Sequence, residues 1–149
     1  MDISRKTRYA LRAIFELSKR YGQGHVKIIE IAKAQATPPR FLEAILNQLK
    51  QAGFVGAKRG KYGGYFLLRP PEELTVGDVM RSIQGPVQLV ECADDNLKDS
   101  CPLHTSCVFL PMWTEAQEAL SSVYDKTTFQ DFLDREKLEA EKHVQNYSI

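Results

Sequence analysis

All three cysteines of this 149-residue chain lie in one polar stretch, "ECADDNLKDSCPLHTSC", with the spacing Cys92-x8-Cys101-x5-Cys107. Three thiols cannot all pair with one another. Thiolates are soft ligands that suit zinc, copper(I) or iron–sulfur clusters. Gaps of eight and five residues are wider than the short gaps of structural zinc knuckles. The spacing therefore predicts a loop that closes around a group larger than one ion.

His104 lies inside the same loop and is a candidate fourth ligand, although an exposed loop histidine fits the pattern equally well. A site with only three thiols predicts a labile iron–sulfur cluster, which suits a sensor. Two metal-free alternatives stay open: buried free thiols, and a switch in which two cysteines form a disulfide under oxidants.

Two other protein classes compete with a sensor: a zinc-stabilised interaction protein, and an enzyme with a cysteine nucleophile and His104 as its base. An enzyme of that kind needs a third orienting group and a pocket, which nothing in the sequence marks. The chain also has no glycine-rich phosphate loop and no HExxH motif. We therefore expect no catalytic activity.

The net charge of +1 conceals a strong asymmetry along the chain. Residues 1–69 hold 14 Lys and Arg against 4 Asp and Glu, whereas residues 70–149 hold 6 against 15. A basic segment of this kind is suited to a polyanion such as DNA. We expect the first part of the chain to bind nucleic acid.

The basic part reads as three helices. The first extends from Ser4 to Tyr21 and places Ala10, Ile14, Leu17 and Tyr21 on one face. A short helix with Ile28, Ile31 and Ala32 follows, and "AQA" makes a tight connection. We expect Thr37 to cap the next helix, with Pro38 at its first position and Gly53 at its end. Its buried face is Leu42, Ile45, Leu46 and Leu49.

Two short helices joined by a tight turn match a helix-turn-helix. The segments "FVGAK" and "YFLL" then read as strands, with "RGKYGG" as the turn between them. A hairpin directly after a recognition helix is the wing of a winged-helix domain. We therefore expect a mainly α fold with a small β-hairpin wing.

The second helix of such a motif enters the major groove of DNA. Arg40 is the best base-reading candidate, with Glu43, Ala44 and Asn47 on the same side. Arg59 at the wing tip suits a narrow minor groove. The candidates for phosphate contacts are Arg5, Lys6, Arg8, Lys58 and Lys61. Thr37 and Tyr62 complete the predicted DNA-binding set. Any one of these charges can equally be a solubilising surface charge.

The phrases "RYALRAIFEL", "KRGKYGGYFLLRP" and "LTVGDVMRSIQGP" resemble the IscR/NsrR family of winged-helix regulators, also called Rrf-type regulators. The resemblance implies a homodimer on a palindromic operator in double-stranded DNA. It implies that Arg59 in the wing reads DNA, together with the start of the second helix at Arg40 and Glu43. Pro38 and Pro39 depart from the small polar side chains of several relatives, which points to a different operator.

The same resemblance implies a [2Fe–2S] or [4Fe–4S] cluster held by Cys92, Cys101 and Cys107. The fourth ligand of the family does not carry over. Relatives with a histidine ligand have it where this chain has Leu110, and relatives with an acidic ligand have it where this chain has Arg8. His104, inside the loop, is a candidate substitute.

The acidic part begins with a helix over "LTVGDVMRSIQG", which Thr75 and Asp78 can cap reciprocally. After the cysteines, "VFLPMWTEAQEALSSVYDK" reads as a long helix. Its apolar stripe is Leu110, Trp113, Ala116, Leu120 and Val123. A second copy of this helix is the expected partner, because most oligomers are symmetric homodimers. A Thr-capped short helix and a charged, frayed tail should end the chain.

These features divide the chain into a winged helix-turn-helix domain over residues 1–74, a connecting helix with a cysteine sensor loop over 75–108, and a dimerisation helix with a tail over 109–149. No apolar run has membrane-spanning length, and charges interrupt the N-terminal segment, so we expect no signal peptide and no membrane partner. The expected location is the cytoplasm.

Overall fold

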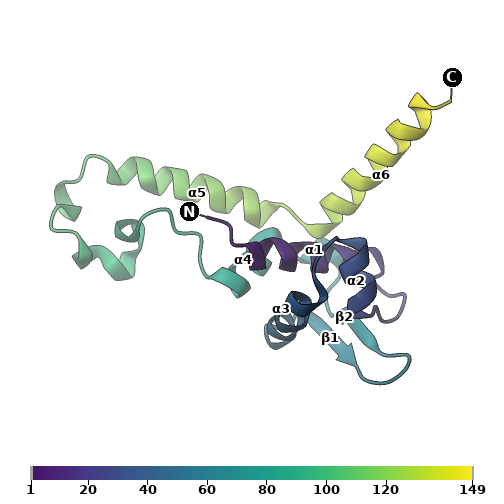
Figure 1. Ribbon diagram of the computed structural model, residues 1–149. Helices are drawn as coiled ribbons and strands as arrows, with labels where there is room; N and C mark the ends of the chain where they lie inside the picture. Colours follow the sequence, from purple (N-terminus) through teal and green to yellow (C-terminus); the bar gives the residue numbers. More distant parts are fainter. Residues whose placement is uncertain (1, 149) are drawn as a thin grey trace.

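The computed structural model describes residues 2–148, and its chain is mainly helical with one small sheet, as expected (Figure 1). The helices are α1 (Arg5–Lys19), α2 (Ile28–Ala34), α3 (Pro39–Gln51), α4 (Val76–Gln84), α5 (Leu110–Lys126) and α6 (Phe129–Asn146). Strands β1 (Val55–Lys58) and β2 (Gly64–Leu67) pair antiparallel, with Val55 opposite Leu67. Short 3-10 turns lie at Pro71–Glu73, Glu91–Ala93, Asp95–Ser100 and His104–Ser106. No helix within residues 2–148 is long and apolar enough to cross a membrane.

Helix α1 is the centre of the hydrophobic core. It begins where the Ser4 hydroxyl accepts a hydrogen bond from the Thr7 backbone, at 3.0 Å. Its predicted stripe is correct except for Tyr21, which lies beyond the helix end and is 42% exposed. The fully buried core residues from α1 and α3 are Ala10, Ala13, Ile14, Leu17, Leu42, Ile45, Leu46 and Leu49. Because α1 packs on α2, α3, α4 and α6, it holds α3 in place.

The start of α3 differs from the prediction by one residue. Thr37 does not cap the helix: its hydroxyl donates to the carbonyl of Gln35, at 3.2 Å. Pro38 has the extended backbone φ −61°, ψ 129°, and Pro39 is the first helical residue. The reason is steric, since a residue that precedes proline is driven out of the α region. The double proline therefore delays the helix.

The hairpin after α3 forms as predicted. Its turn uses Gly60 at φ 112°, a conformation that favours glycine. A further bridge joins Tyr65 to Val26, whose N–H and C=O groups each pair at 2.8 Å. The hairpin is therefore attached to the segment that leads into α2.

Helices α4 and α6 both begin with capping boxes. In α4, Thr75 and Asp78 exchange hydrogen bonds of 3.1 and 3.2 Å, as predicted. In α6, Thr128 and Asp131 do the same at 3.2 and 2.8 Å. Phe129, in the first turn of α6, is 1% exposed and belongs to the core around α1.

The expectation of a short last helix with a frayed tail was wrong, because α6 continues for 18 residues. Its charged part, "DREKLEAEKH", consists mostly of strong helix formers. Lys142 and Glu139 also form a pair at 3.1 Å on its surface. In Figure 1 this helix projects away from the folded body.

Residues 87–126 form what we call the arm: the cysteine segment (residues 87–109) and α5. The arm extends to one side of the body in Figure 1. It is attached where Asp125 meets Arg81, at 2.7 Å, and where Gly77 leaves no room for a Cβ beside Asp125. The Leu89 backbone donates to Gln117 at 3.1 Å, which holds the cysteine segment against α5. We call the remainder, residues 4–86 with the first turn of α6, the winged-helix unit.

Candidate nucleic-acid interface and cysteine segment

Helix α3 separates its buried and exposed residues cleanly. Leu42, Ile45, Leu46 and Leu49 face the core, whereas Arg40, Glu43, Ala44 and Asn47 are all exposed on the other side. The exposed set offers one guanidinium, one carboxylate, one carboxamide and one methyl group within two helical turns. These are the groups that read base edges in a major groove.

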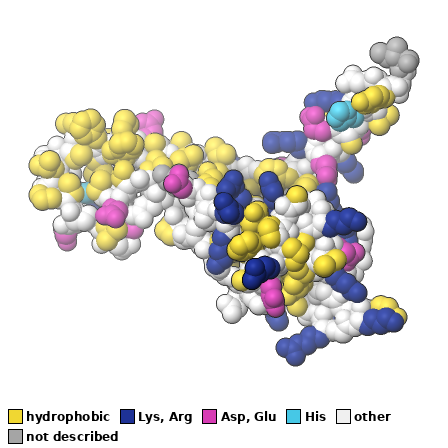
Figure 2. All heavy atoms as spheres, in the orientation of Figure 1, with side chains coloured by type: hydrophobic (Ala, Val, Ile, Leu, Met, Phe, Trp, Pro, Cys, Tyr) yellow, Lys and Arg dark blue, Asp and Glu magenta, His cyan; other side chains and the backbone are white. Residues whose placement is uncertain are grey.

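A hollow of about 360 Å³ lies beside this face, between the start of α1 and the start of α3. Tyr9 and Phe41 form part of its apolar lining, with ring centroids 6.3 Å apart, and Arg5 and Lys6 lie at its edge. Figure 2 shows hydrophobic side chains gathered on this side of the winged-helix unit, with Lys and Arg around them. Phe41 is 54% exposed. This surface therefore combines apolar contact area with cations.

The wing carries the second group of predicted residues. Lys58, Arg59 and Lys61 are exposed, and Figure 2 shows Lys and Arg side chains at the far end of the hairpin. Tyr62 is 83% exposed, with the Lys61 ammonium 5.7 Å from its ring centroid. Together with Arg5 and Arg8, also exposed, the predicted cations all face solvent.

Thr37 lies apart from the other predicted DNA-binding residues, because it is only 3% exposed. Its hydroxyl is occupied by the Gln35 carbonyl. It therefore supports the turn between α2 and α3 rather than facing solvent.

The cysteine segment holds its three thiols free and half-buried. Cys101 and His104 line one hollow of about 390 Å³, whereas Cys92 and Cys107 do not line it. Within residues 2–148, no three Cys, His, Asp or Glu side chains converge as metal ligands. The donor chemistry suits an iron–sulfur cluster, but the segment must close further before three sulfurs could share one.

Charge pairs already organise the same segment. The Lys98 ammonium, 2.9 Å from Asp95, donates a hydrogen bond that lowers the pKa of that carboxyl below its ordinary value. Asp94 accepts from the Asn96 backbone at 2.8 Å and caps the following turn. These two carboxylates therefore have protein partners of their own.

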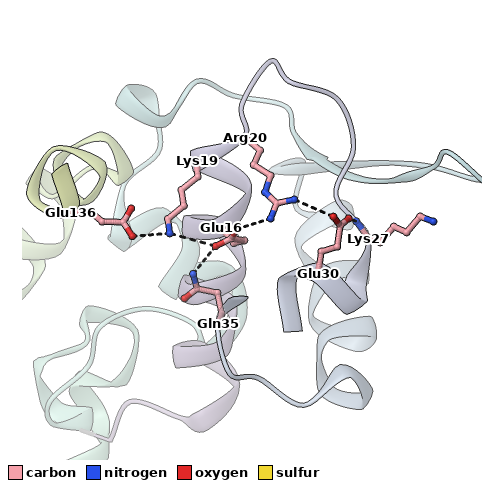
Figure 3. Close-up of polar contacts among 7 residues, drawn as sticks. All are labelled: Glu16, Lys19, Arg20, Lys27, Glu30, Gln35 and Glu136. Atoms are coloured by element: carbon pink, nitrogen blue, oxygen red, sulfur yellow. Dashed lines mark hydrogen bonds and ion pairs between the residues drawn. The ribbon is translucent and has the colours of Figure 1, made fainter. Parts of the chain in front are cut away.

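The sequence analysis missed a polar network beneath the helix-turn-helix (Figure 3). At its centre is Glu16, which is 3% exposed and accepts a hydrogen bond of 2.8 Å from the Gln35 side chain. Arg20 and Lys19 approach the same carboxylate at 3.2 and 3.7 Å. The available signal was Glu16 itself, a charge that lies next to Leu17 and three residues after Ala13 on the buried side of α1.

Comparisons with known proteins agree with this arrangement. The pattern of the Rrf2 family, described as an iron-dependent transcriptional regulator, matches residues 3–135. The HTH-type transcriptional regulator CymR of Bacillus subtilis (strain 168) is 35% identical over 131 residues, which cover 88% of each chain. The HTH-type transcriptional regulator IscR of Aliivibrio salmonicida (strain LFI1238) is 30% identical over 125 residues, covering 84% of this chain and 73% of IscR.

Solved structures give the same result. CymR, described as the global cysteine regulator of B. subtilis, has a TM-score of 0.73 at 31% identity and covers 91% of this chain and 98% of its own. T. potens IscR has a TM-score of 0.69 at 29% identity, covering 91% and 88%. The winged-helix architecture, the family match and these relatives lead to one conclusion: the chain belongs to the Rrf2 family of transcriptional regulators.

Proposed function

We propose that this protein is a homodimeric regulator that binds a palindromic operator and senses iron–sulfur, redox or nitric oxide status through its cysteine segment. The observation that carries the DNA-binding part is the surface described above. One side of a well-packed unit presents the exposed face of α3, and the same unit carries a hairpin tipped by Lys58, Arg59 and Lys61. That combination suits a groove-reading helix with a wing beside it.

The exposed side chains divide into base readers and phosphate binders. Arg40 can bridge guanine O6 and N7, Glu43 can accept from cytosine, and Asn47 can pair with adenine. Ala44 and Phe41 offer apolar contact to thymine methyl groups. Arg59 suits the minor groove. The phosphate set is Arg5, Lys6, Arg8, Lys58 and Lys61, with Tyr62 beside it.

The proposed dimer uses α5. No side chain of this helix is buried, although its stripe contains Trp113 and Val123, which are 37% and 60% exposed. A contiguous apolar face on a soluble chain marks an interaction surface. A second copy of α5 would bury it and would place two recognition helices for two half-sites.

The proposed sensor uses Cys92, Cys101 and Cys107, with His104 as the fourth ligand. A bound cluster would supply redox-sensitive iron, and the chain would supply the thiolates that hold it. The segment is held to α5 through Leu89 and Gln117, and α5 to the winged-helix unit through Asp125 and Arg81. Closure of the segment can therefore act on the DNA-binding surface, provided that the cluster binds its two arrangements with different free energies.

A metal-free mode of sensing is the second candidate, in which the thiols themselves or another ligand carry the signal. It is favoured by the separation of the three sulfurs, since no metal-ligand group forms among residues 2–148. A relative, CymR, is described as a global cysteine regulator, which supports a signal other than iron–sulfur status.

Iron and acid-labile sulfide per protomer, measured on protein purified without oxygen, separate these two modes. Near-stoichiometric iron and sulfide that are lost in Cys101→Ala would support the cluster and direct attention to His104. Absence of both from the anaerobic wild-type protein would contradict the cluster and leave the metal-free mode.

The DNA-binding part is tested with Arg59→Ala. The variant should weaken binding to a duplex selected by the wild-type protein from random DNA by about 1–3 kcal/mol. Lys137→Ala is the control, because Lys137 is exposed on α6, away from the wing. Equal affinity of wild-type and Arg59→Ala protein, or equal loss in both variants, would contradict the role of the wing.

A further inference from the structure

Glu16 is a buried carboxylate that takes no part in the proposed DNA contacts or in the proposed sensor. It points from α1 toward the turn that joins α2 and α3, and Figure 3 shows Gln35, Arg20 and Lys19 converging on it. The Gln35 contact is the shortest of the three, at 2.8 Å. A charge is seldom placed at 3% exposure without partners of this kind.

Gln35 is the residue through which the turn is held. Its backbone carbonyl accepts from the Thr37 hydroxyl at 3.2 Å and from the Arg12 guanidinium at 3.4 Å. Its side chain donates to Glu16. The turn is therefore fastened to α1 at two points, by Arg12 on the carbonyl and by Glu16 on the side chain.

The turn has a backbone conformation that needs support. Ala36, directly after Gln35, has φ 48°. Among residues 2–148 it is the one non-glycine residue with a positive φ. A side chain is disfavoured there, so the conformation persists where the surroundings impose it. Helix α3 begins at Pro39, three residues later, and Arg40 follows. The turn thus sets where the exposed face of α3 starts.

The outer contacts of the network are weaker candidates for such a role. Lys19 pairs with Glu136 of α6 at 2.8 Å and Arg20 with Glu30 of α2 at 3.4 Å, but these partners are largely solvated. Exposed pairs of this kind contribute little. A buried ion pair is itself weak evidence for stability and is better suited to fixing one geometry.

We propose that Glu16 is a positioning residue for DNA recognition. By accepting the hydrogen bond of Gln35, it fixes the turn and hence the place of Arg40 and the following residues against the bases. This inference rests on the proposed function, in which α3 reads the operator.

The test starts with Gln35, because a substitution of Glu16 alone would also remove the carboxylate that Arg20 and Lys19 share, so its effect would not report on the Gln35 contact. Gln35→Leu removes the side-chain amide that donates to Glu16, whereas Arg20 and Lys19 remain beside the Glu16 carboxylate. Gln51→Leu is the matched control, since Gln51 is an exposed glutamine at the end of α3. The probes are a duplex selected by the wild-type protein from random DNA and a shuffled duplex of the same composition.

Affinity for both duplexes is measured together with thermal unfolding. A positioning role predicts that Gln35→Leu lowers the ratio of specific to non-specific affinity at least about fivefold, the lower limit for one misread base pair. Affinity for the shuffled duplex, which depends on phosphates, should be unchanged. A purely structural role would lower the melting temperature and leave the ratio alone.

The exchange Glu16→Gln with Gln35→Glu supplies the rescue. It restores a hydrogen bond between the two side chains with its direction reversed, and most of the lost ratio should return. An unchanged ratio in folded Gln35→Leu, or a double variant no better than Gln35→Leu, would overturn the positioning role and leave DNA binding intact. A wild-type protein that selects no duplex would remove the proposed function and this inference together.

Discussion

The winged-helix unit and the arm are built in different ways. The unit surrounds α1 with a core drawn from α1 to α4, the hairpin and Phe129. The arm has no such core: α5 has no buried side chain, and the cysteine segment consists of short 3-10 turns. The unit buries its apolar residues within one chain, whereas the arm leaves most apolar side chains of α5 exposed and its three thiols half-buried.

This difference fits the different tasks that we propose for the two regions. A preformed core keeps the exposed residues of α3 and the wing in fixed relative positions, which base reading requires. A segment with few buried contacts opens and rearranges at low cost, which suits an element that must respond to a signal. The predictions below test this contrast.

The largest effect is expected in the core of the unit. Phe129→Ala should lower the free energy of unfolding by about 3 kcal/mol, because it removes a ring that is 1% exposed and belongs to the core around α1. Phe109→Ala in the arm is the control: Phe109 is 62% exposed, and its loss should cost about 0.5 kcal/mol or less in the monomer. Urea unfolding at low protein concentration measures both. Similar losses of unfolding free energy in the two variants would contradict the difference in packing between the winged-helix unit and the arm.

The next largest effect should be confined to the arm. Val123→Asp places a charge on the proposed dimer face of α5 and should raise the dimer dissociation constant at least about tenfold, since a desolvated, unpaired charge is unfavourable. Sedimentation velocity over a concentration series measures it. Glu118→Gln, on another side of α5, should leave the constant unchanged. A wild-type protein that is monomeric at every concentration would contradict the proposed dimer.

A smaller effect should appear with pH. Burial raises the pKa of Asp78, but hydrogen bonds with Thr75 and Arg81 outweigh it and bring the pKa below the ordinary value of 3.8. The ordinary pKa of 3.8 applies to the unfolded chain, so the resulting stabilisation of the folded state is fully present above pH 3.8. It is lost as the pH falls through the lower pKa of the folded state.

Asp78→Asn should therefore be less stable than the wild-type protein at neutral pH, and the two unfolding curves should converge in acid. Asp95→Asn in the arm should show a still smaller difference, because the Asp95–Lys98 pair is exposed to solvent. A difference for Asp78→Asn that stays constant with pH would contradict the role assigned to its charge.

Features that depend on local sequence were predicted correctly, whereas contacts between distant residues were not. Helix positions, the hairpin and the α4 cap followed from apolar periodicity and turn residues, which act locally. The start of α3 was missed because two adjacent prolines, Pro38 and Pro39, compete for the first helical position. The attachment of α6 through Phe129 and the Glu16–Gln35 contact were missed because they join residues far apart in the chain.

The cysteine segment shows a different limit of sequence reasoning. Spacing and the family resemblance predicted Cys92, Cys101 and Cys107 as ligands of one group, whereas no three candidate ligands converge within residues 2–148 of the single chain. Spacing reports which residues could meet. It does not report whether a partner subunit or a bound group is needed to bring them together.

The smallest effect concerns backbone strain in the unit. Ala36→Gly removes the Cβ from a residue at φ 48°. The variant should be more stable than the wild-type protein by about 1 kcal/mol or less. The gain is small because the relief of strain is partly offset by the conformational freedom that glycine adds to the unfolded chain. Ala140→Gly, at an exposed helical site in α6, should instead destabilise by about 1 kcal/mol. Opposite signs for the same Ala→Gly change would show that the backbone is strained at Ala36. If Ala36→Gly destabilises as much as Ala140→Gly, the strain at Ala36 is not real, and the need for Gln35 to hold the turn disappears with it.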